Sequence, residues 1–185
     1  MTDVFGGLAG GGGDAVSAAL SDAEVARLDE VIEGAAVLGA ELEPTYRVLA
    51  LTLEPTPERY AWGTTTDRRI QLLASPVSTM LVSLRRLAED GTKDLLTFEQ
   101  ERLVDVVAAL DGPAIAGPVF GRPEPRPGEW GPRFSLEGRS SAPDGTGRTL
   151  RLELEAAELR FGLFARFDEV QLRDTNGQTL ALPSA

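Results

Sequence analysis

The chain has 185 residues, a formal net charge of −11, and neither histidine nor cysteine. The length suffices for one domain with a core of its own, and the acidic charge argues against binding to nucleic acid or to an anionic membrane surface. Without histidine and cysteine, Ser-His-Asp and Cys-His catalysis are excluded within this chain, as are zinc, haem and iron–sulfur sites built on those ligands.

The same composition indicates where the protein is found. No stretch approaches the roughly 20 apolar residues of a membrane span, and no basic residue precedes Arg27, so a secretory signal is not expected. Without cysteine there is no disulfide framework to mark a secreted protein. The positive charge is almost entirely arginine, which together with the many Ala, Gly and Leu residues is typical of high-GC coding. We therefore expect a bacterial, cytoplasmic protein.

The chain begins with a glycine-rich tail over residues 1–20. Its glycine cluster is not a phosphate-binding loop, because no strand precedes it and no GKS or GKT follows it. Ser21 and Glu24 then have the spacing of a capping box. The spacing of the apolar residues after them predicts a helix over residues 22–33, ended by Gly34.

Two strands are predicted next, over residues 35–43 and 46–54, with a turn at residues 44–45. The second contains a nearly continuous apolar run over residues 48–53, which is typical of a strand covered on both faces. A shorter aromatic strand is predicted at Glu58–Trp62.

Residues 67–91 give the strongest local signal. A buried strand at Ile70–Ala74 is predicted to lead into a helix, with Ser75 as the N-cap and Pro76 at the first helical position. A β-hairpin turning at these two residues is rejected, because two-residue hairpin loops need a positive φ that proline cannot adopt. The apolar residues that follow have helical spacing, at Val77, Met80, Leu81, Leu84, Leu87 and Ala88.

A brief strand at Asp94–Phe98 and a second helix follow. Thr97 is the predicted cap of this helix, with Gln100 at the capping-box position. The predicted buried face consists of Leu103, Val106, Val107 and Leu110. Gly112 ends the helix.

The part of the chain after residue 111 differs from the rest. Residues 112–132 contain six prolines and five glycines and are predicted to form a strap without regular structure. Residues 133–185 show alternating apolar and polar positions, with a strand at Arg133–Arg139 and a turn at Asp174–Gly177 that leads into Thr179–Leu182.

The predicted fold is therefore α+β: a mainly antiparallel β-sheet with two or three helices, followed by a C-terminal β meander. Residues 21–111 form the mixed part. We expect residues 133–185 to pack with that part as one compact domain, either by extending the first sheet or by forming their own.

One group of residues predicts an anion-binding or ligand-binding site. Guanidinium groups beside hydroxyls at a helix N-terminus can hold a phosphate or carboxylate. The candidates are Arg68, Arg69, Ser75, Ser78 and Thr79, with Tyr60 or Trp62 as a wall. The alternative is that these arginines, with Arg85 and Arg86 at the opposite end of the helix, form surface ion pairs with the abundant acids.

Trp130 in the strap is the candidate partner contact, because a tryptophan among prolines can anchor a bound protein. It can equally fix the strap to its own domain. Neither a metal nor a cofactor is expected. Asp168, Glu169, Asp174 and Asn176 miss the spacing of a calcium loop, and Asp and Asn suit a tight turn without metal.

Taken together, the sequence favours a non-catalytic protein of unknown function that acts through protein–protein interaction or self-association as a homo-oligomer. The alternative is a protein that binds a small anionic ligand, or an enzyme that uses carboxylates with Mg²⁺. No partner among nucleic acids or membranes is expected.

Overall fold

The computed structural model describes residues 19–60, 67–88, 91, 93–126, 129–130, 133–134 and 147–182. The strands are β1 (Ala36–Glu43), β2 (Val48–Glu54), β3 (Ile70–Leu87), β4 (Lys93–Leu96), β5 (Arg133–Phe134), β6 (Arg148–Ala156) and β7 (Leu159–Asp174). The helices are α1 (Asp22–Ile32) and α2 (Leu103–Ala108), with a 3-10 turn, η1 (Gln100–Arg102), before α2.

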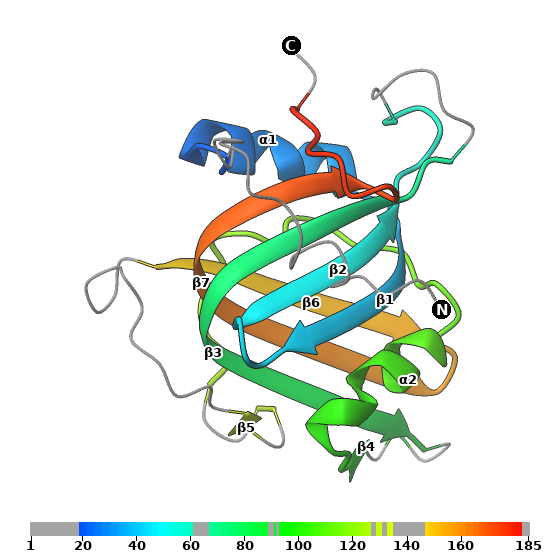
Figure 1. Cartoon of the computed structure of the whole chain (residues 1–185). Helices are drawn as coiled ribbons and strands as arrows, with labels where there is room; N and C mark the ends of the chain where they lie inside the picture. Colours follow the sequence, from blue (N-terminus) through cyan, green and yellow to red (C-terminus); the bar gives the residue numbers. More distant parts are fainter. Residues whose placement is uncertain are drawn as a thin grey trace.

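The described strands form one antiparallel sheet in the order β1-β2-β3-β7-β6, with β4 and β5 both paired to β3. The fold is α+β, as predicted, and β6 and β7 extend the sheet begun by β1, β2 and β3. The sheet is strongly curved, with α1 and α2 lying at its two ends (Figure 1).

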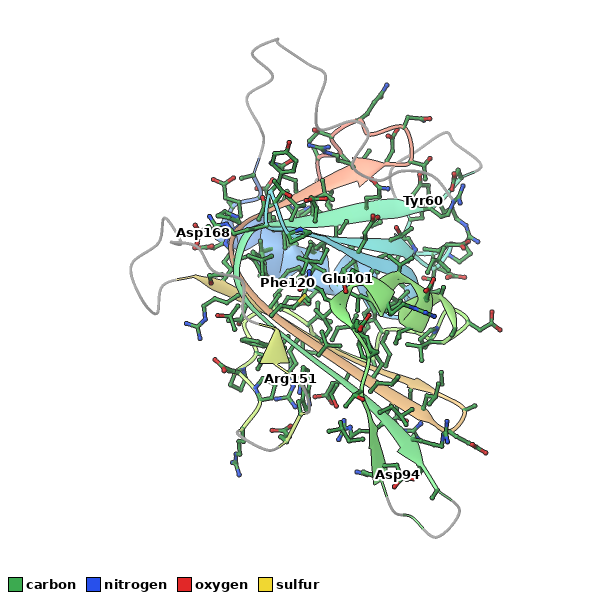
Figure 2. All side chains as sticks on the ribbon, turned by 60° about the horizontal axis from the view of Figure 1, so that its bottom comes forward. Tyr60, Asp94, Glu101, Phe120, Arg151 and Asp168 are labelled. Atoms are coloured by element: carbon green, nitrogen blue, oxygen red, sulfur yellow. The ribbon has the colours of Figure 1, made fainter. Side chains whose placement is uncertain are left out.

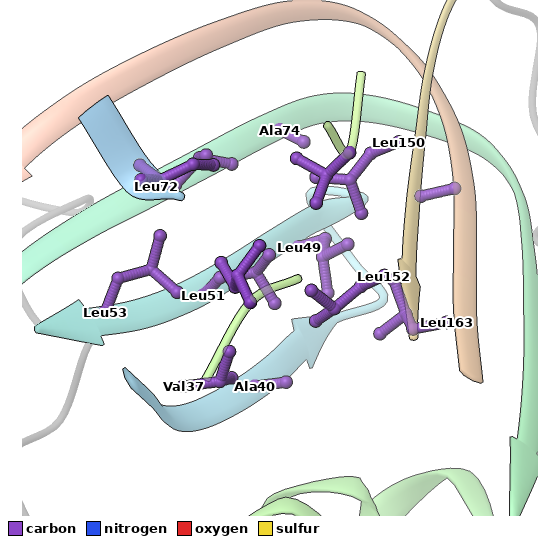
Figure 3. Close-up of a cluster of buried hydrophobic side chains, with 14 of the residues drawn as sticks. Val37, Ala40, Leu49, Leu51, Leu53, Leu72, Ala74, Leu150, Leu152 and Leu163 are labelled. Carbon is purple, nitrogen blue, oxygen red and sulfur yellow. The ribbon is translucent and has the colours of Figure 1, made fainter. Parts of the chain in front are cut away.

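The core fills the concave side of this sheet. Side chains from β1, β2, β3, β6 and β7 point toward one another there (Figure 3), among them Leu49, Leu51, Leu72, Leu150, Leu152 and Leu163. Each of these side chains is at most 2 % exposed. Because neighbouring residues of a strand point to opposite faces, the run predicted over residues 48–53 divides between the core and the convex face.

The helix predicted after Ser75 is wrong, because residues 70–87 form the single strand β3. β3 pairs with β7 along nearly its whole length, from Ile70 to Arg86. Its other edge pairs with β2, β5 and β4 in turn. These ladders satisfy the backbone groups that a helix would otherwise pair internally. The Ser75–Pro76 bond is cis, and the ladder with β7 is irregular between Val77 and Thr79.

Residues 113–121 of the strap join the two outer strands of the sheet. At β1, the N–H of Ile115 donates to Ala35 O and Ala114 forms a bridge to Ala36. At β6, Phe120 forms a bridge to Leu150. The strap therefore has no helix or strand of its own in its described part, as predicted, yet it closes the curved sheet by pairing with both edges.

The first helix forms as predicted, and its cap explains its start. Ser21 Oγ accepts from the N–H of Glu24, and the N–H of Ser21 donates to Glu24 Oε2 at 2.8 Å, which completes the capping box. Leu28 and Ile32 are buried in the core. α2 also forms near its predicted place, but without the predicted cap: no side chain caps η1 or α2, and both begin after Thr97.

Three shorter predictions have mixed outcomes. Glu58 lies in a turn and Tyr60 has no regular structure, so no strand forms there, while Trp62 lies outside the described residues. Only Arg133–Phe134 of the predicted strand 133–139 is described, as β5. Thr179 forms one isolated bridge to Arg173, so the full C-terminal meander stays a prediction.

Candidate functional site

The predicted anion-binding arginines are both paired with carboxylates. The side chain of Arg69 binds Asp67 through two hydrogen bonds, from Nε at 2.9 Å and from a terminal nitrogen at 2.7 Å, and its backbone N–H donates to Asp67 Oδ1 at 3.0 Å. Thr175 Oγ1 also donates to Asp67, at 3.2 Å. The hydrogen bonds from Arg69 hold the pKa of Asp67 far below its ordinary value. Arg68 forms an ion pair with Glu54 at 2.8 Å.

The hydroxyl groups predicted for the same site lie elsewhere. Ser75, Ser78 and Thr79 belong to β3, so there is no helix N-terminus for them to form. Ser75 lies six positions after Arg69 along extended backbone, which separates the two residues by about 20 Å. Ser78 Oγ donates instead to the carbonyl of Arg166 at 3.3 Å. The predicted set is therefore not brought together.

Tyr60 lies near the arginines but has a structural contact of its own. Its hydroxyl donates to the carbonyl of Asp67 at 3.1 Å, and both residues lie in the connection between β2 and β3. Trp62, the other predicted wall, lies within residues 61–66 and so outside the described residues.

A small hollow of about 280 Å³ lies beside Arg69. Its lining includes Gly39, Thr52 and Gln71, which are paired across three neighbouring strands. Gly39 has no side chain, and a Cβ there would approach only Thr52, at 3.8 Å. Since Arg69 already binds Asp67, the hollow has polar groups but no unpaired positive charge from this arginine.

Trp130 packs on the convex face of its own sheet. It is 8 % exposed and forms an apolar cluster with Leu81 and Phe164. The ring lies so close to Gly162 that a Cβ on this residue would come within 2.8 Å of it. Arg151 lies over the ring at 5.0 Å from its centre. The strap is thus anchored intramolecularly at Trp130, which leaves little of this side chain for a partner.

A half-buried carboxylate joins α1 to the strap. Asp29 Oδ1 accepts from the backbone N–H of Val119 at 2.8 Å and from that of Phe120 at 3.3 Å. Burial raises the pKa of Asp29 above its ordinary value, and the two hydrogen bonds offset part of that rise. This contact is structural, because both donors are backbone groups of the same chain.

The far ends of β3 and β4 form a projecting hairpin, which we call the β3–β4 arm (residues 84–87 and 93–96). Figure 2 shows Asp94 on this arm, which extends away from the rest of the sheet. Among the described residues, β4 pairs with β3 alone. Its Leu95 is 49 % exposed, and only Tyr46 among the other large apolar side chains of the described residues is comparably exposed.

A larger hollow, about 690 Å³, lies between the end of α2 and the turn that joins β6 to β7. Its charged lining consists of Asp111, Glu155, Glu158 and Arg86, and its apolar lining includes Leu110, Ala156 and Leu159. Figure 1 shows α2 beside this end of the β6–β7 hairpin.

The acidic residues weighed as metal ligands are used otherwise where the structure shows their bonds. Asp174 Oδ1 accepts from the backbone N–H groups of Asn176 and Gln178, at 2.9 Å and 2.8 Å, which stabilises the turn. Across the described residues, no group of three or more His, Cys, Asp or Glu is placed to hold a metal ion. Nor does any helix among them have the length and apolar character needed to span a membrane.

Sequence reasoning missed both hollows and the arm. The alternating pattern in residues 150–163 could have located the β6–β7 hairpin and its turn at Ala157-Glu158. No local pattern could have placed α2 beside that turn, because the contact joins segments more than 40 residues apart. Comparison of the chain with models of protein families, with curated proteins and with solved structures finds no match.

Proposed function

We propose that this chain is a non-catalytic cytoplasmic protein that acts through protein–protein interaction, and that the β3–β4 arm associates with the arm of a second copy. The observation that carries the proposal is the edge strand β4, which is paired on one side and presents Leu95 to solvent. An unpaired strand edge offers backbone donors and acceptors to another strand.

The register of the arm supports pairing between copies. Leu84 and Arg86 of β3 lie opposite Leu96 and Asp94 of β4. The N–H of Leu87 donates to Glu158 O, on the β7 side of β3. Because backbone groups alternate along a strand, those of Arg85 also face β7, and those of Leu84 and Arg86 face β4. The N–H and C=O of Leu95 therefore point to the free edge. A second β4, antiparallel to the first, can pair there and bring two Leu95 side chains together across a two-fold axis.

The expected association is weak. A four-residue strand offers far less area than the roughly 1,200 Å² of a stable interface. We therefore expect monomer at low concentration and dimer only at high concentration.

The test uses the absence of cysteine from the chain. Leu95→Cys introduces the only thiol, and this variant should form a disulfide-linked dimer under mild oxidation at high protein concentration. Tyr46→Cys is the matched control, because Tyr46 is 64 % exposed but lies in the turn between β1 and β2. Equal cross-linking of the two variants would contradict the proposal.

The second candidate function is binding of a small anionic ligand in the hollow beside Arg69. The observation in its favour is the convergence of Thr52, Gln71 and Arg69 on one hollow. It is the weaker candidate, because Asp67 already neutralises Arg69. Gly39 lines this hollow, so a larger side chain at this position would fill it. Gly39→Leu should abolish the rise in melting temperature that a small anionic ligand causes, whereas Gly39→Ala should preserve it.

A further inference from the structure

The outer edge of β6 is used by the strap only in part. The N–H of Arg151 donates to Val119 O at 2.7 Å. In an antiparallel strand, alternate residues direct their backbone groups to the same edge. The N–H and C=O of Glu153 and Glu155 therefore point to the edge that the strap occupies at Arg151. Within the described part of the chain, these groups have no hydrogen-bond partner on that edge.

The strap leaves β6 where this free edge begins. On the N-terminal side of Val119 it crosses to β1, where the N–H of Ile115 donates to Ala35 O at 2.9 Å. The free part of β6 leads to the hollow of about 690 Å³ beside α2, which Glu155 helps to line. A strand that continued the strap's pairing with β6 would pass along this hollow.

The charges around the hollow are unbalanced. Asp111, Glu155 and Glu158 contribute three carboxylates, against one guanidinium from Arg86. Glu155 also binds Arg160, at 3.0 Å, but is 72 % exposed and remains accessible. An incoming segment with positive side chains would therefore be attracted here, in keeping with the net charge of −11 on the whole chain.

We propose that the free edge of β6 binds an extended segment of a partner protein in which basic and apolar residues alternate. A residue paired with Glu155 has its side chain on the same face as this exposed carboxylate, where a basic group is favoured, whereas Glu153 already binds Arg151. The residues next to it in the segment point to the other face, toward Leu110, Ala156 and Leu159, where apolar groups are favoured.

This inference rests on the proposed function as an interaction protein but uses a different surface from the β3–β4 arm. A second copy of this chain is a poor occupant, because its acidic surface would meet three carboxylates. The two proposals can therefore fail separately: a chain that stays monomeric at all concentrations still permits peptide binding at β6.

The test is fluorescence anisotropy with a labelled synthetic peptide, acetyl-Thr-Arg-Val-Arg-Val-Thr-amide, and the full-length protein. We expect saturable binding that weakens as salt is added, because part of the attraction is electrostatic. The same peptide with both arginines replaced by glutamate should bind at least about 30-fold more weakly. Equal binding of the two peptides, or no binding of the basic peptide, would overturn the proposal.

Two variants at one position separate charge from backbone pairing. Glu155→Gln removes the carboxylate and keeps the N–H, so binding should weaken about three- to tenfold. Glu155→Pro also removes the N–H that faces the free edge, and the peptide should no longer bind. The N–H of residue 155 is not used in the ladder with β7, so proline is compatible with the strand.

Controls keep these results interpretable. Glu169→Gln removes a carboxylate from an exposed position of β7 and should leave peptide binding unchanged. Circular dichroism and the melting temperature of each variant show whether it folds. If Glu155→Pro folds and binds the basic peptide as the wild type does, the β6 edge is not the site. Concentration-dependent protection of the Glu153 and Glu155 amides without peptide would identify a second copy as the occupant and overturn the proposal.

Discussion

Asp29 is the residue whose role is clearest from its contacts. Its carboxylate accepts two backbone hydrogen bonds from the strap. Asp29→Ala leaves both N–H groups without this acceptor, and we expect the free energy of unfolding to fall by about 2 kcal/mol. Asp29→Asn keeps one carbonyl-type oxygen in place and should lose less. Urea unfolding of the three proteins measures the difference, and equal losses would contradict the assignment.

Asp29 also predicts a dependence on pH. Burial raises its pKa in the folded state, so folding favours the protonated carboxyl. Its contribution to stability is therefore complete below the ordinary pKa and is lost as the pH rises through the raised value. The wild type should gain stability relative to Asp29→Asn as the pH is lowered from about 7 to about 4. Urea unfolding at both pH values checks this, and a constant difference would show that Asp29 does not titrate as expected.

Gly162 and Trp130 form a pair that a double-mutant cycle can test. A Cβ at residue 162 would meet the Trp130 ring at 2.8 Å. We expect Gly162→Ala to destabilise the fold by about 1–3 kcal/mol, because the ring must move. In a Trp130→Ala background the same change should cost much less. Additive losses would mean that the ring is not the obstacle.

Residue-level signals in the sequence were reliable where both partners are close in the chain. Ser21 and Glu24 are three residues apart, and their capping box is present as predicted. The two uses of Trp130 could not be separated from sequence, because Gly162 and Arg151 are more than 20 residues away. Likewise, ion pairs were one of the two interpretations of Arg68 and Arg69, but the sequence did not show that Glu54, 14 residues before Arg68, would be the partner of that arginine.

At the scale of elements, α1 offers a direct test of its cap. Ser21→Ala removes the acceptor for the N–H of Glu24, and a cap of this kind contributes about 1 kcal/mol. The hydrogen bonds from Ser21 lower the pKa of Glu24, so the part of the cap that depends on the Glu24 carboxylate is present above the ordinary carboxyl pKa and is lost as the pH falls through the lowered value.

The measurement is chemical unfolding of the wild type and Ser21→Ala at about pH 7 and about pH 3. The difference between the two proteins should be smaller at the lower pH, because the hydrogen bond from Ser21 Oγ to the Glu24 carboxylate is lost there while the one from the Glu24 N–H to Ser21 Oγ is not. A difference that is the same at both pH values would show that the Glu24 carboxylate does not contribute to the cap.

β3 shows why local patterns failed for one element. Its apolar positions fit a helical repeat, and Ser75-Pro76 has the chemistry of a helix start. The two-residue alternation of a strand is equally present in the sequence, and it places Met80, Val82 and Leu84 in the core. What decides between them is the ladder with β7, whose residues lie about 70 to 100 positions further along the chain. Such long-range pairing overrides local propensity.

At the scale of the whole molecule, the strap makes the curved sheet continuous. One buried cluster contains side chains from α1, α2, the strap and five strands. We therefore expect one cooperative unfolding transition, with Trp fluorescence and far-ultraviolet circular dichroism changing together. Two separate transitions would mean that the C-terminal hairpin and the N-terminal strands unfold independently.

The alternating pattern of residues 148–172 was enough to predict antiparallel strands, and these strands extend the first sheet. The closure by the strap could not be predicted, because its bridges at Ala114 and Phe120 follow no sequence repeat. For the same reason, the sequence could not show that β4 and the second half of β6 would have free edges.

The most direct test of the proposed function is hydrogen–deuterium exchange of the full-length protein at about 2 µM and about 500 µM. Pairing of the β3–β4 arm with a second copy predicts slower exchange at residues 93–96 at the higher concentration. That protection should be absent in Leu95→Asp, since the substitution places two carboxylates at the axis. Exchange at these residues that is the same at both concentrations would contradict association through the arm.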